Sequence, residues 1–180
     1  GVVGPFTGEG ATYGEAMKRG VDLAIKEANG LASPPAIQFV ALYEDDKLSS
    51  KDGISAFRKL VDVDKVQAIV GSAGSSVSLA LAPLAAESKI VLLSPISTAD
   101  SLRDAGAFFF RDIPPNRNQA KTAAFFIRQY LKKSKVAVFY ENNDYGNNMK
   151  TIISQHLVPL GGEVVMGLAY ESGQRDFKDA

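Results

Sequence analysis

Short apolar segments alternate with helix-like segments along this chain of 180 residues. The apolar segments are rich in valine, isoleucine and phenylalanine, a composition typical of buried strands. Between them, apolar residues recur every three or four positions, as on one face of an amphipathic helix. The predicted order is βαβαβαβ, a linker and then αβαβ. Strands that alternate with helices form parallel sheets covered by helices, so the sequence predicts an α/β fold.

The expected elements follow from these patterns. Strands are expected at residues 2–3, 36–43, 66–70, 90–93, 107–110, 136–140 and 163–170, with a charged loop at Glu44–Asp46. Helices are expected at 13–28, 49–61, from the serines at 75–76 to Ser88, at 118–132 and at 145–160, with another opening at Asp176. Asp52, three residues after Ser49, completes a capping-box pattern. Pro83 either starts a turn of its helix or kinks it.

A domain boundary is expected at Arg111–Asn116, because the two prolines in this segment prevent a helix from crossing it. The chain then divides into a first lobe at residues 1–112 and the start of a second lobe at residues 113–180. Each lobe is expected to be a doubly wound parallel sheet, the second one incomplete. The chain begins on a strand-like segment and ends on a helix-like one, so we expect it to be a fragment of a longer protein.

Composition excludes several classes of function. Lysine plus arginine and aspartate plus glutamate number 20 each, so the chain lacks the basic excess that nucleic-acid binding requires. Cysteine is absent, which excludes disulfides, thiolate catalysis and cysteine-based zinc sites. His156 is the only histidine, which excludes a multi-histidine metal site. No long uncharged apolar run is present to span a membrane. We expect neither a cofactor nor a metal.

Two glycine- and serine-rich stretches follow neighbouring strands of the predicted sheet. Gly71–Ser76 follows the strand that ends at Val70, and Ser94–Thr98 follows the strand that ends at Leu93. In an open parallel sheet, the carboxyl ends of the strands form the edge where ligands bind. Hydroxyls and free backbone N–H groups at that edge suit a small anionic group such as a carboxylate.

These serines have other interpretations. Ser75 or Ser76 could cap the following helix, and Thr98 could be a turn residue. Ser75 or Ser97 could be a nucleophile, but neither lies in a Gly-x-Ser-x-Gly motif, and the chain places no base to activate it. The acidic residues at 44–46 and at 144 could bind a metal, although such loops are usually only solvated.

Tyr13 and Tyr145 share a pattern: each opens a helix after a strand-end loop, and each precedes a glycine. Either these rings pack their helices onto the sheet, or they face each other across an interdomain cleft and sandwich the apolar part of a ligand. The segment Gly8–Tyr13 also resembles a dinucleotide fingerprint, but Tyr13 replaces the third glycine, which that motif needs for close helix packing.

Together these residues resemble the periplasmic solute-binding proteins of ABC transporters, of the leucine/isoleucine/valine-binding type. The resemblance runs along the whole chain and rests on an ordered set of short motifs. They are Gly4-Pro-Phe-Thr-Gly8, Tyr13-Gly14, Tyr43-Glu-Asp-Asp46, Val70-Gly71 with Ser75-Ser76, Ser94-Pro-Ile-Ser-Thr98, Arg111-Asp-Ile-Pro-Pro-Asn116, Asp144-Tyr-Gly146 and Asp176-Phe177. The resemblance implies the type I periplasmic-binding-protein fold, in which two lobes joined by three crossover strands close on a ligand.

The resemblance also implies site roles. The hydroxyl and backbone N–H of Ser75, in the loop that it shares with Ser76, would hold the ligand's carboxylate. Thr98 would add a hydroxyl and an N–H, and Ser97 or Ile96 a backbone carbonyl for the ammonium group. Tyr13 and Tyr145 would flank the ligand's side chain. Ile96 and Ser97 stand where the family commonly has small residues, which implies a narrower or differently polar pocket.

The function implied is binding without catalysis. The ligand would be a small amino acid, aliphatic or branched-chain, delivered to an ABC permease in the membrane. The protein would be a monomer in the periplasm or another extracytoplasmic space, either free or lipid-anchored, with no nucleic-acid partner. The family's acidic contact to the ammonium group would lie beyond Ala180. The alternative is a ligand-sensing domain of a regulator or receptor with the same fold, binding an amide or another small molecule.

Overall fold

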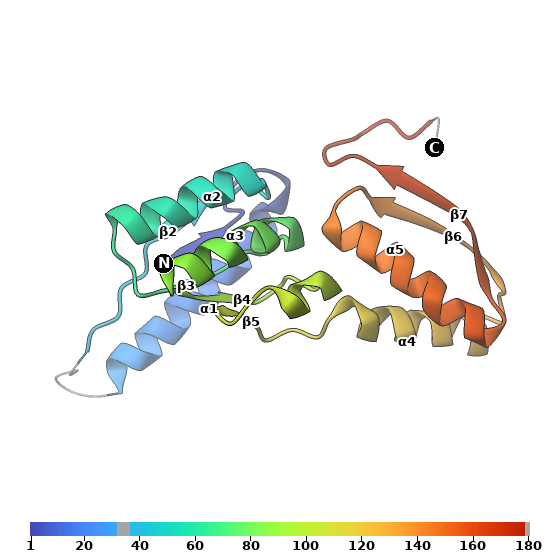
Figure 1. Cartoon of the computed structure of the whole chain (residues 1–180), viewed down its shortest axis with the longest axis horizontal. Coiled ribbons are helices and arrows are strands. Elements are labelled where there is room, and N and C mark those ends of the chain that lie inside the picture. The colour runs from blue at the N-terminus through green and yellow to red at the C-terminus, as the bar shows by residue number, and fades with distance from the viewer. Residues whose placement is uncertain (32–36, 179–180) are drawn as a thin grey trace. The chain divides into compact units, whose positions relative to one another are not determined.

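The computed structural model describes residues 1–31 and 37–178 and divides the chain into two compact units (Figure 1). Unit 1 contains Gly1–Ser97 and Asp104–Asp112, and unit 2 contains Thr98–Arg103 and Ile113–Ala180. Each unit has its own parallel sheet. The assignment of these units as ligand-binding lobes stays a prediction.

Unit 1 is built on a five-stranded parallel sheet with the order β2-β1-β3-β4-β5. The strands are β1 (Val2–Gly4), β2 (Tyr43–Asp45), β3 (Ala68–Val70), β4 (Val91–Ser94) and β5 (Phe109–Arg111). The chain moves from β1 outward to β2, then returns past β1 to β3. This reversal is a topological switch point, the place in an open parallel sheet where ligands bind.

Three helices cover the sheet of unit 1: α1 (Ala11–Gly30), α2 (Ser50–Arg58) and α3 (Ser75–Ser88). Figure 1 shows α2 and α3 together on one side of the strands and α1 on the other. The strand order explains this division. The crossovers to β3 and β4 run opposite to the crossover from β1 to β2, and right-handed crossovers in opposite directions place their helices on opposite faces.

Apolar side chains from both layers fill the space between this sheet and α2 and α3. Those with at most 1% exposure include Val3, Ile69 and Leu92 from the strands, and Phe57, Val77 and Leu81 from the helices. Burial of each such side chain contributes about 1.5–3 kcal/mol relative to leaving it exposed. The core therefore holds α3 firmly against β3 and β4, which fixes the place where α3 begins.

Unit 2 contains a parallel pair of strands, β6 (Lys135–Glu141) and β7 (Glu163–Tyr170). Exposed and partly buried residues alternate along β6 from Lys135 to Tyr140, as on a strand with one covered face. Helix α5 (Asp144–Leu157) packs along both strands, and α4 (Asn116–Gln129) packs against α5. Gly161 adopts the left-handed conformation, with φ 73°, that a helix end favours.

The predicted strand at 36–43 is wrong over most of its length. Ala36 lies outside the described residues, residues 37–42 are irregular, and the strand begins only at Tyr43. The side-chain amide of Asn29 explains the difference, because it donates to the carbonyl of Phe39 at 2.9 Å and accepts from its N–H at 2.8 Å. A strand partner would need those same backbone groups. The predicted charged loop therefore begins later, since Glu44 and Asp45 belong to β2.

Three further expectations concern helix ends. The Ser49 hydroxyl accepts a hydrogen bond from the N–H of Asp52 at 3.3 Å, which confirms Ser49 as the cap of α2. The second bond of the capping box is replaced, because the N–H of Ser49 donates to the carbonyl of Asp46 at 2.7 Å. Pro83 lies inside a continuous α3, so it does not start a helix. The helix predicted to open at Asp176 is wrong, because residues 174–177 are irregular and the Asp176 carbonyl accepts from the side chain of Gln174 at 2.8 Å.

Candidate ligand-binding site

The loops after β3 and β4 lie side by side at the carboxyl edge of the unit 1 sheet. Val70 pairs with Leu93 in the strand register, and the N–H of Gly71 donates to the carbonyl of Leu93 at 2.8 Å. Gly71 has φ +147°, and a Cβ atom there would lie 2.1 Å from the carbonyl oxygen of Val3. Only glycine fits this close approach between the end of β3 and β1.

Serine hydroxyls join the two loops. The Ser94 hydroxyl donates to the carbonyl of Ser72 at 2.7 Å, and the Ser97 hydroxyl lies 3.0 Å from that same carbonyl. The Ser97 hydroxyl also lies 2.8 Å from the Ser78 hydroxyl. All four serines are at most 1% exposed. Their side chains therefore fix the loops to each other.

Helix α3 begins immediately after the loop that contains Ser72. Gly74, which has extended φ and ψ, is its N-cap, so the interpretation of Ser75 or Ser76 as the capping residue is wrong. Ser75 is the first helical residue and is 5% exposed, and the carbonyl of Ser76 accepts from the Ser50 hydroxyl at 3.2 Å. The first N–H groups of a helix point out from its start and favour an anion there.

Asp46 lies beneath the same edge and is fully buried. Its carboxylate accepts from the Ser72 hydroxyl and, at 2.9 Å, from the N–H of Leu48. Burial raises the pKa of the Asp46 carboxyl, and these hydrogen bonds only partly offset that effect. The prediction of a charged loop did not single out this residue. Its place in the sequence could have identified Asp46, because it directly follows a strand whose end lies at the same sheet edge as Ser72 and Ser94.

The two acidic side chains that precede Asp46, considered above as possible metal ligands, have separate partners. The Asp45 carboxylate accepts from the N–H of Phe6 at 2.8 Å and from the Thr7 hydroxyl, so it fixes the loop after β1. Glu44 forms an ion pair with Lys59. Within residues 1–31 and 37–178, no group of three or more metal-ligating side chains is gathered in one place.

Tyr13 and Ile96 lie in unit 1 with the serine loops. Tyr13, in the first turn of α1, is 54% exposed. Its neighbour Gly14 explains the tight entry to α1, because a Cβ there would lie 2.2 Å from the carbonyl oxygen of Pro5. Ile96 is partly buried and packs against the small cluster that contains Val2, Met17 and Ala73. The carbonyl of Ser97 accepts from Arg111 at 3.4 Å.

Thr98 and Tyr145 belong to unit 2. Thr98 is 5% exposed, and its carbonyl accepts from the N–H of Asn116 at 2.8 Å. Tyr145 is 42% exposed and lies in the first turn of α5. Its neighbour Gly146, like Gly14, lies too close to a backbone carbonyl for a side chain, since a Cβ there would lie 2.0 Å from the carbonyl oxygen of Glu141.

Asn116 is fully buried, whereas the sequence indicated only that it ends the linker at Arg111–Asn116. Its side-chain amide donates to Asn148 at 2.9 Å and to the carbonyl of Tyr145 at 3.3 Å. Asn148 in turn accepts from the N–H of Asp100 at 3.0 Å. These bonds hold the start of α4, the start of α5 and the segment at 98–103 together within unit 2. The spacing of asparagines in the sequence gave no sign of this contact.

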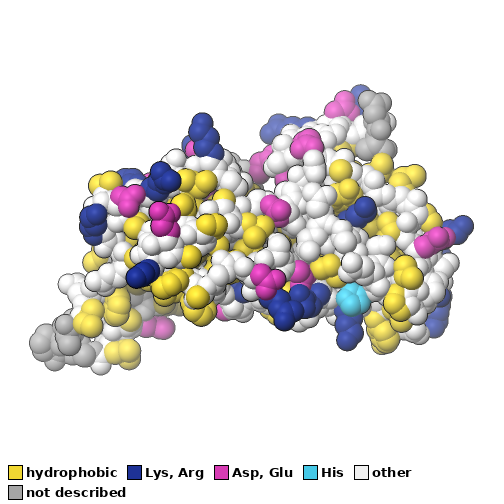
Figure 2. Space-filling view, in the orientation of Figure 1, with side chains coloured by type: hydrophobic (Ala, Val, Ile, Leu, Met, Phe, Trp, Pro, Cys, Tyr) yellow, Lys and Arg dark blue, Asp and Glu magenta, His cyan; other side chains and the backbone are white. Residues whose placement is uncertain are grey.

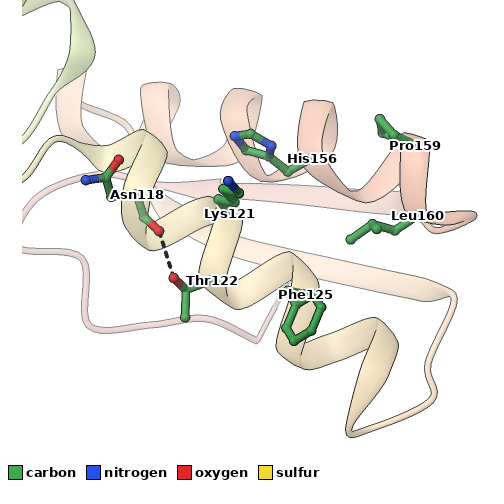
Figure 3. Close-up of a pocket in the computed structure, with 7 residues that line it drawn as sticks. All are labelled: Asn118, Lys121, Thr122, Phe125, His156, Pro159 and Leu160. Carbon is green, nitrogen blue, oxygen red and sulfur yellow. Dashed lines mark hydrogen bonds between the residues drawn. The ribbon is translucent and has the colours of Figure 1, made fainter.

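A separate groove of about 750 Å³ lies in unit 2 between α4 and the end of α5 (Figure 3). Its lining combines Phe125, Pro159 and Leu160 with the polar side chains of Lys121 and His156. It contains no residue predicted to bind ligand. On the face of the molecule shown in Figure 2, acidic and basic side chains are interspersed, in keeping with the balanced total charge.

The whole described chain matches one protein family. The sequence pattern of the family described as periplasmic binding protein covers residues 1–180. The chain belongs to that family. A Leu/Ile/Val-binding protein homolog from Brucella abortus is 29% identical over 178 residues, which are 98% of this chain and 48% of the relative. The chain spans about half the length of the curated relatives that it matches.

Solved structures confirm the predicted fold class. A leucine-binding protein from Thermotoga maritima is 26% identical, with a TM-score of 0.91 over 99% of this chain and 50% of that protein. A solute-binding protein from Rhodopseudomonas palustris, in complex with 3,4-dihydroxybenzoic acid, has a TM-score of 0.88 at 20% identity, over 99% of this chain and 48% of that protein. The second likeness concerns the fold alone.

Proposed function

We propose that the protein is the solute-binding component of an ABC transporter and that it binds an aliphatic amino acid without chemical change. One observation carries the proposal: two serine-bearing loops are fixed side by side at the switch-point edge of the unit 1 sheet, with the start of α3 above them. The names of relatives that bind leucine, isoleucine or valine support the ligand class.

The proposed contacts divide between head group and side chain. Ser75 and Ser76, at the start of α3, hold the carboxylate through backbone N–H groups and the Ser75 hydroxyl. The hydroxyl and N–H of Thr98 assist, and a carbonyl from Ile96 or Ser97 receives the ammonium group. Helix starts and hydroxyls stabilise a carboxylate because both present hydrogen-bond donors.

Tyr13 and Tyr145 are proposed to flank the ligand's side chain. Both rings are more than two-fifths exposed, so neither is a core residue of its own unit. An exposed aromatic ring loses water-facing apolar surface when a ligand covers it, and this contributes to affinity. The second lobe is proposed to close on the ligand, which excludes water and strengthens the polar contacts.

Delivery to a membrane permease and a monomeric state complete the proposal. Within the described residues, no helix has the length and hydropathy needed to cross a bilayer. A ligand-sensing domain of a regulator or receptor is the alternative, and it would bind an amide or another small molecule in a similar cleft.

Isothermal titration of the intact protein tests the ligand class. The panel is L-leucine, L-isoleucine, L-valine, 3,4-dihydroxybenzoate and urea. We expect heat of binding with the aliphatic amino acids, and a dissociation constant raised about tenfold in Ser75→Ala, from the loss of one hydrogen bond to a charged group. Heat only with the aromatic acid or urea would contradict the amino-acid assignment. Unchanged affinity in Ser75→Ala would contradict the site.

A further inference from the structure

Five buried polar side chains join three strand-end loops beneath the start of α3. We call this set the polar network: Asp46 from the loop after β2, Ser72 and Ser78 from the β3 loop and α3, and Ser94 and Ser97 from β4 and its loop. Each is at most 1% exposed. Ser97 is also a proposed ligand contact through its carbonyl. The other four have no contact role.

Ser72 is the centre of the polar network. Its N–H donates to the Ser78 hydroxyl at 3.2 Å, and its carbonyl accepts from the hydroxyls of Ser94 and Ser97. Its own hydroxyl donates to Asp46 and accepts from the N–H of Gly74 at 3.3 Å. Because the single proton of that hydroxyl points toward the Asp46 carboxylate, a lone pair of the hydroxyl oxygen is free to accept from the Gly74 N–H.

Gly74 is the N-cap of α3, and Ser75 follows it. The position of the first turn of α3 therefore depends on the hydrogen bond from the Gly74 N–H to the Ser72 hydroxyl oxygen. Asp46 determines that acceptor's orientation, because only a hydrogen-bond acceptor at this place turns the Ser72 proton away from Gly74. The Leu48 N–H holds the carboxylate from its other side, at 2.9 Å.

We propose that Asp46, acting through Ser72, is a positioning residue that holds the start of α3 in the geometry that receives the ligand's head group. The inference rests on the proposed function in so far as α3 carries the ligand contact. A buried carboxylate is costly to the fold because it gives up its hydration. A carboxylate kept under a ligand edge is better explained by the orientation that it imposes than by stability.

The charges around Asp46 agree with this interpretation. Asp45 and Asp52 add negative charge near it, and burial is the largest cause of its raised pKa. The Ser72 and Leu48 hydrogen bonds act in the opposite direction and favour the carboxylate form. Its two donors are the Ser72 hydroxyl, in the loop that leads into α3, and the Leu48 N–H, in the loop that leads into α2.

The test uses the intact protein and the variants Asp46→Asn, Ser72→Ala and their double mutant. Two quantities are measured: amide hydrogen exchange at Gly74 without ligand, and the dissociation constant for L-leucine. We expect each single variant to speed exchange at Gly74 and to weaken L-leucine binding about tenfold. Because both substitutions break one linked pair, the double variant should be no weaker than the worse single variant.

Ser49→Ala is the matched control, since Ser49 lies on the same loop as Asp46 and caps α2 outside the polar network. It should lower stability by the loss of a helix cap while leaving Gly74 exchange and L-leucine affinity unchanged. If Asp46→Asn does not fold, Ser72→Ala carries the test alone. Unchanged exchange and affinity in folded variants, or equal effects in Ser49→Ala, would overturn the proposal. A wild-type protein that fails to bind L-leucine would contradict the proposed function instead, and Gly74 exchange would still decide whether Asp46 positions the loop.

Discussion

At the scale of single residues, close backbone contacts decide which side chains the binding edge can contain. Gly71 lies against β1, Gly14 lies against the loop before α1, and Gly146 lies against the end of β6. In the sequence, Gly14 and Gly146 stood out only because each follows a tyrosine. The structure supplies the cause: a Cβ atom at either position would overlap a carbonyl oxygen.

Gly71→Ala should therefore lower the free energy of unfolding by about 2–4 kcal/mol, because it forces a Cβ into the Val3 carbonyl at a φ that alanine rarely adopts. Urea denaturation measures the change. Gly20→Ala is the control, since it lies within α1 with open space around it and should stabilise the helix by up to about 1 kcal/mol. Equal loss in both variants would show that the close contact does not matter.

The Asp45 carboxylate gives a pH-dependent prediction at the same scale. Partial burial acts to raise its pKa, but hydrogen bonds from Thr7, Lys47 and Phe6 outweigh burial and lower it. Thr7→Val removes one donor, so the pKa of Asp45 should rise in an NMR titration of its carboxyl carbon. A lowered native pKa stabilises the fold above the ordinary pKa of aspartate, and this contribution is lost as pH falls through the native value.

The difference in stability between wild type and Thr7→Val should therefore be present at neutral pH and disappear in acid. A difference that is constant with pH would mean that the Thr7 hydroxyl acts by some means other than the Asp45 charge. Thr122→Val is a suitable comparison, since its hydroxyl donates only to the backbone carbonyl of Asn118 in α4, at 3.0 Å.

At the scale of elements, helix starts were well predicted where a side chain caps them. Ser49 and Asn143 each accept from an N–H of the first turn. The strand predicted at 36–43 is wrong over most of its length because an apolar run also fits a connection whose backbone is held by Asn29, and such a side-chain contact leaves no periodic signal. The strands predicted at 136–140 and 163–170 correspond to β6 and β7, which pair in parallel with a register shift between Val136 and Ala137.

Asn143→Ala should lower stability by about 1 kcal/mol, since the side chain accepts from the N–H of Gly146 at 2.9 Å at the start of α5. Asn143→Ser should restore most of that loss, because a serine hydroxyl can accept the same bond. Thermal unfolding of the wild type, Asn143→Ala and Asn143→Ser measures the order of their stabilities. Thr151→Ala, in the exposed middle of α5, should have almost no effect, and a loss as large as that of Asn143→Ala would exclude capping as the cause.

At the scale of the whole molecule, the alternation of strands and helices was sufficient to predict the α/β class and two parallel sheets. The sequence also led to the two serine loops, whose nearness follows from strand order. It did not lead to Asp46 or Asn116, because buried polar residues owe their roles to partners far along the chain, such as Ser72 and Asn148. Their residue types alone resemble ordinary loop residues.

The central claim is that the start of α3 and its neighbouring loop hold the head group of an amino acid. Backbone amide NMR of the intact protein, titrated with L-leucine, tests it most directly. We predict that the largest shifts of unit 1 fall on the N–H groups of Ser75 and Ser76 and in the loop at 94–97, while His156 and the groove at α4 stay unchanged. Saturable shifts confined to other parts of the chain, with Ser75 and Ser76 unmoved, would contradict the claim.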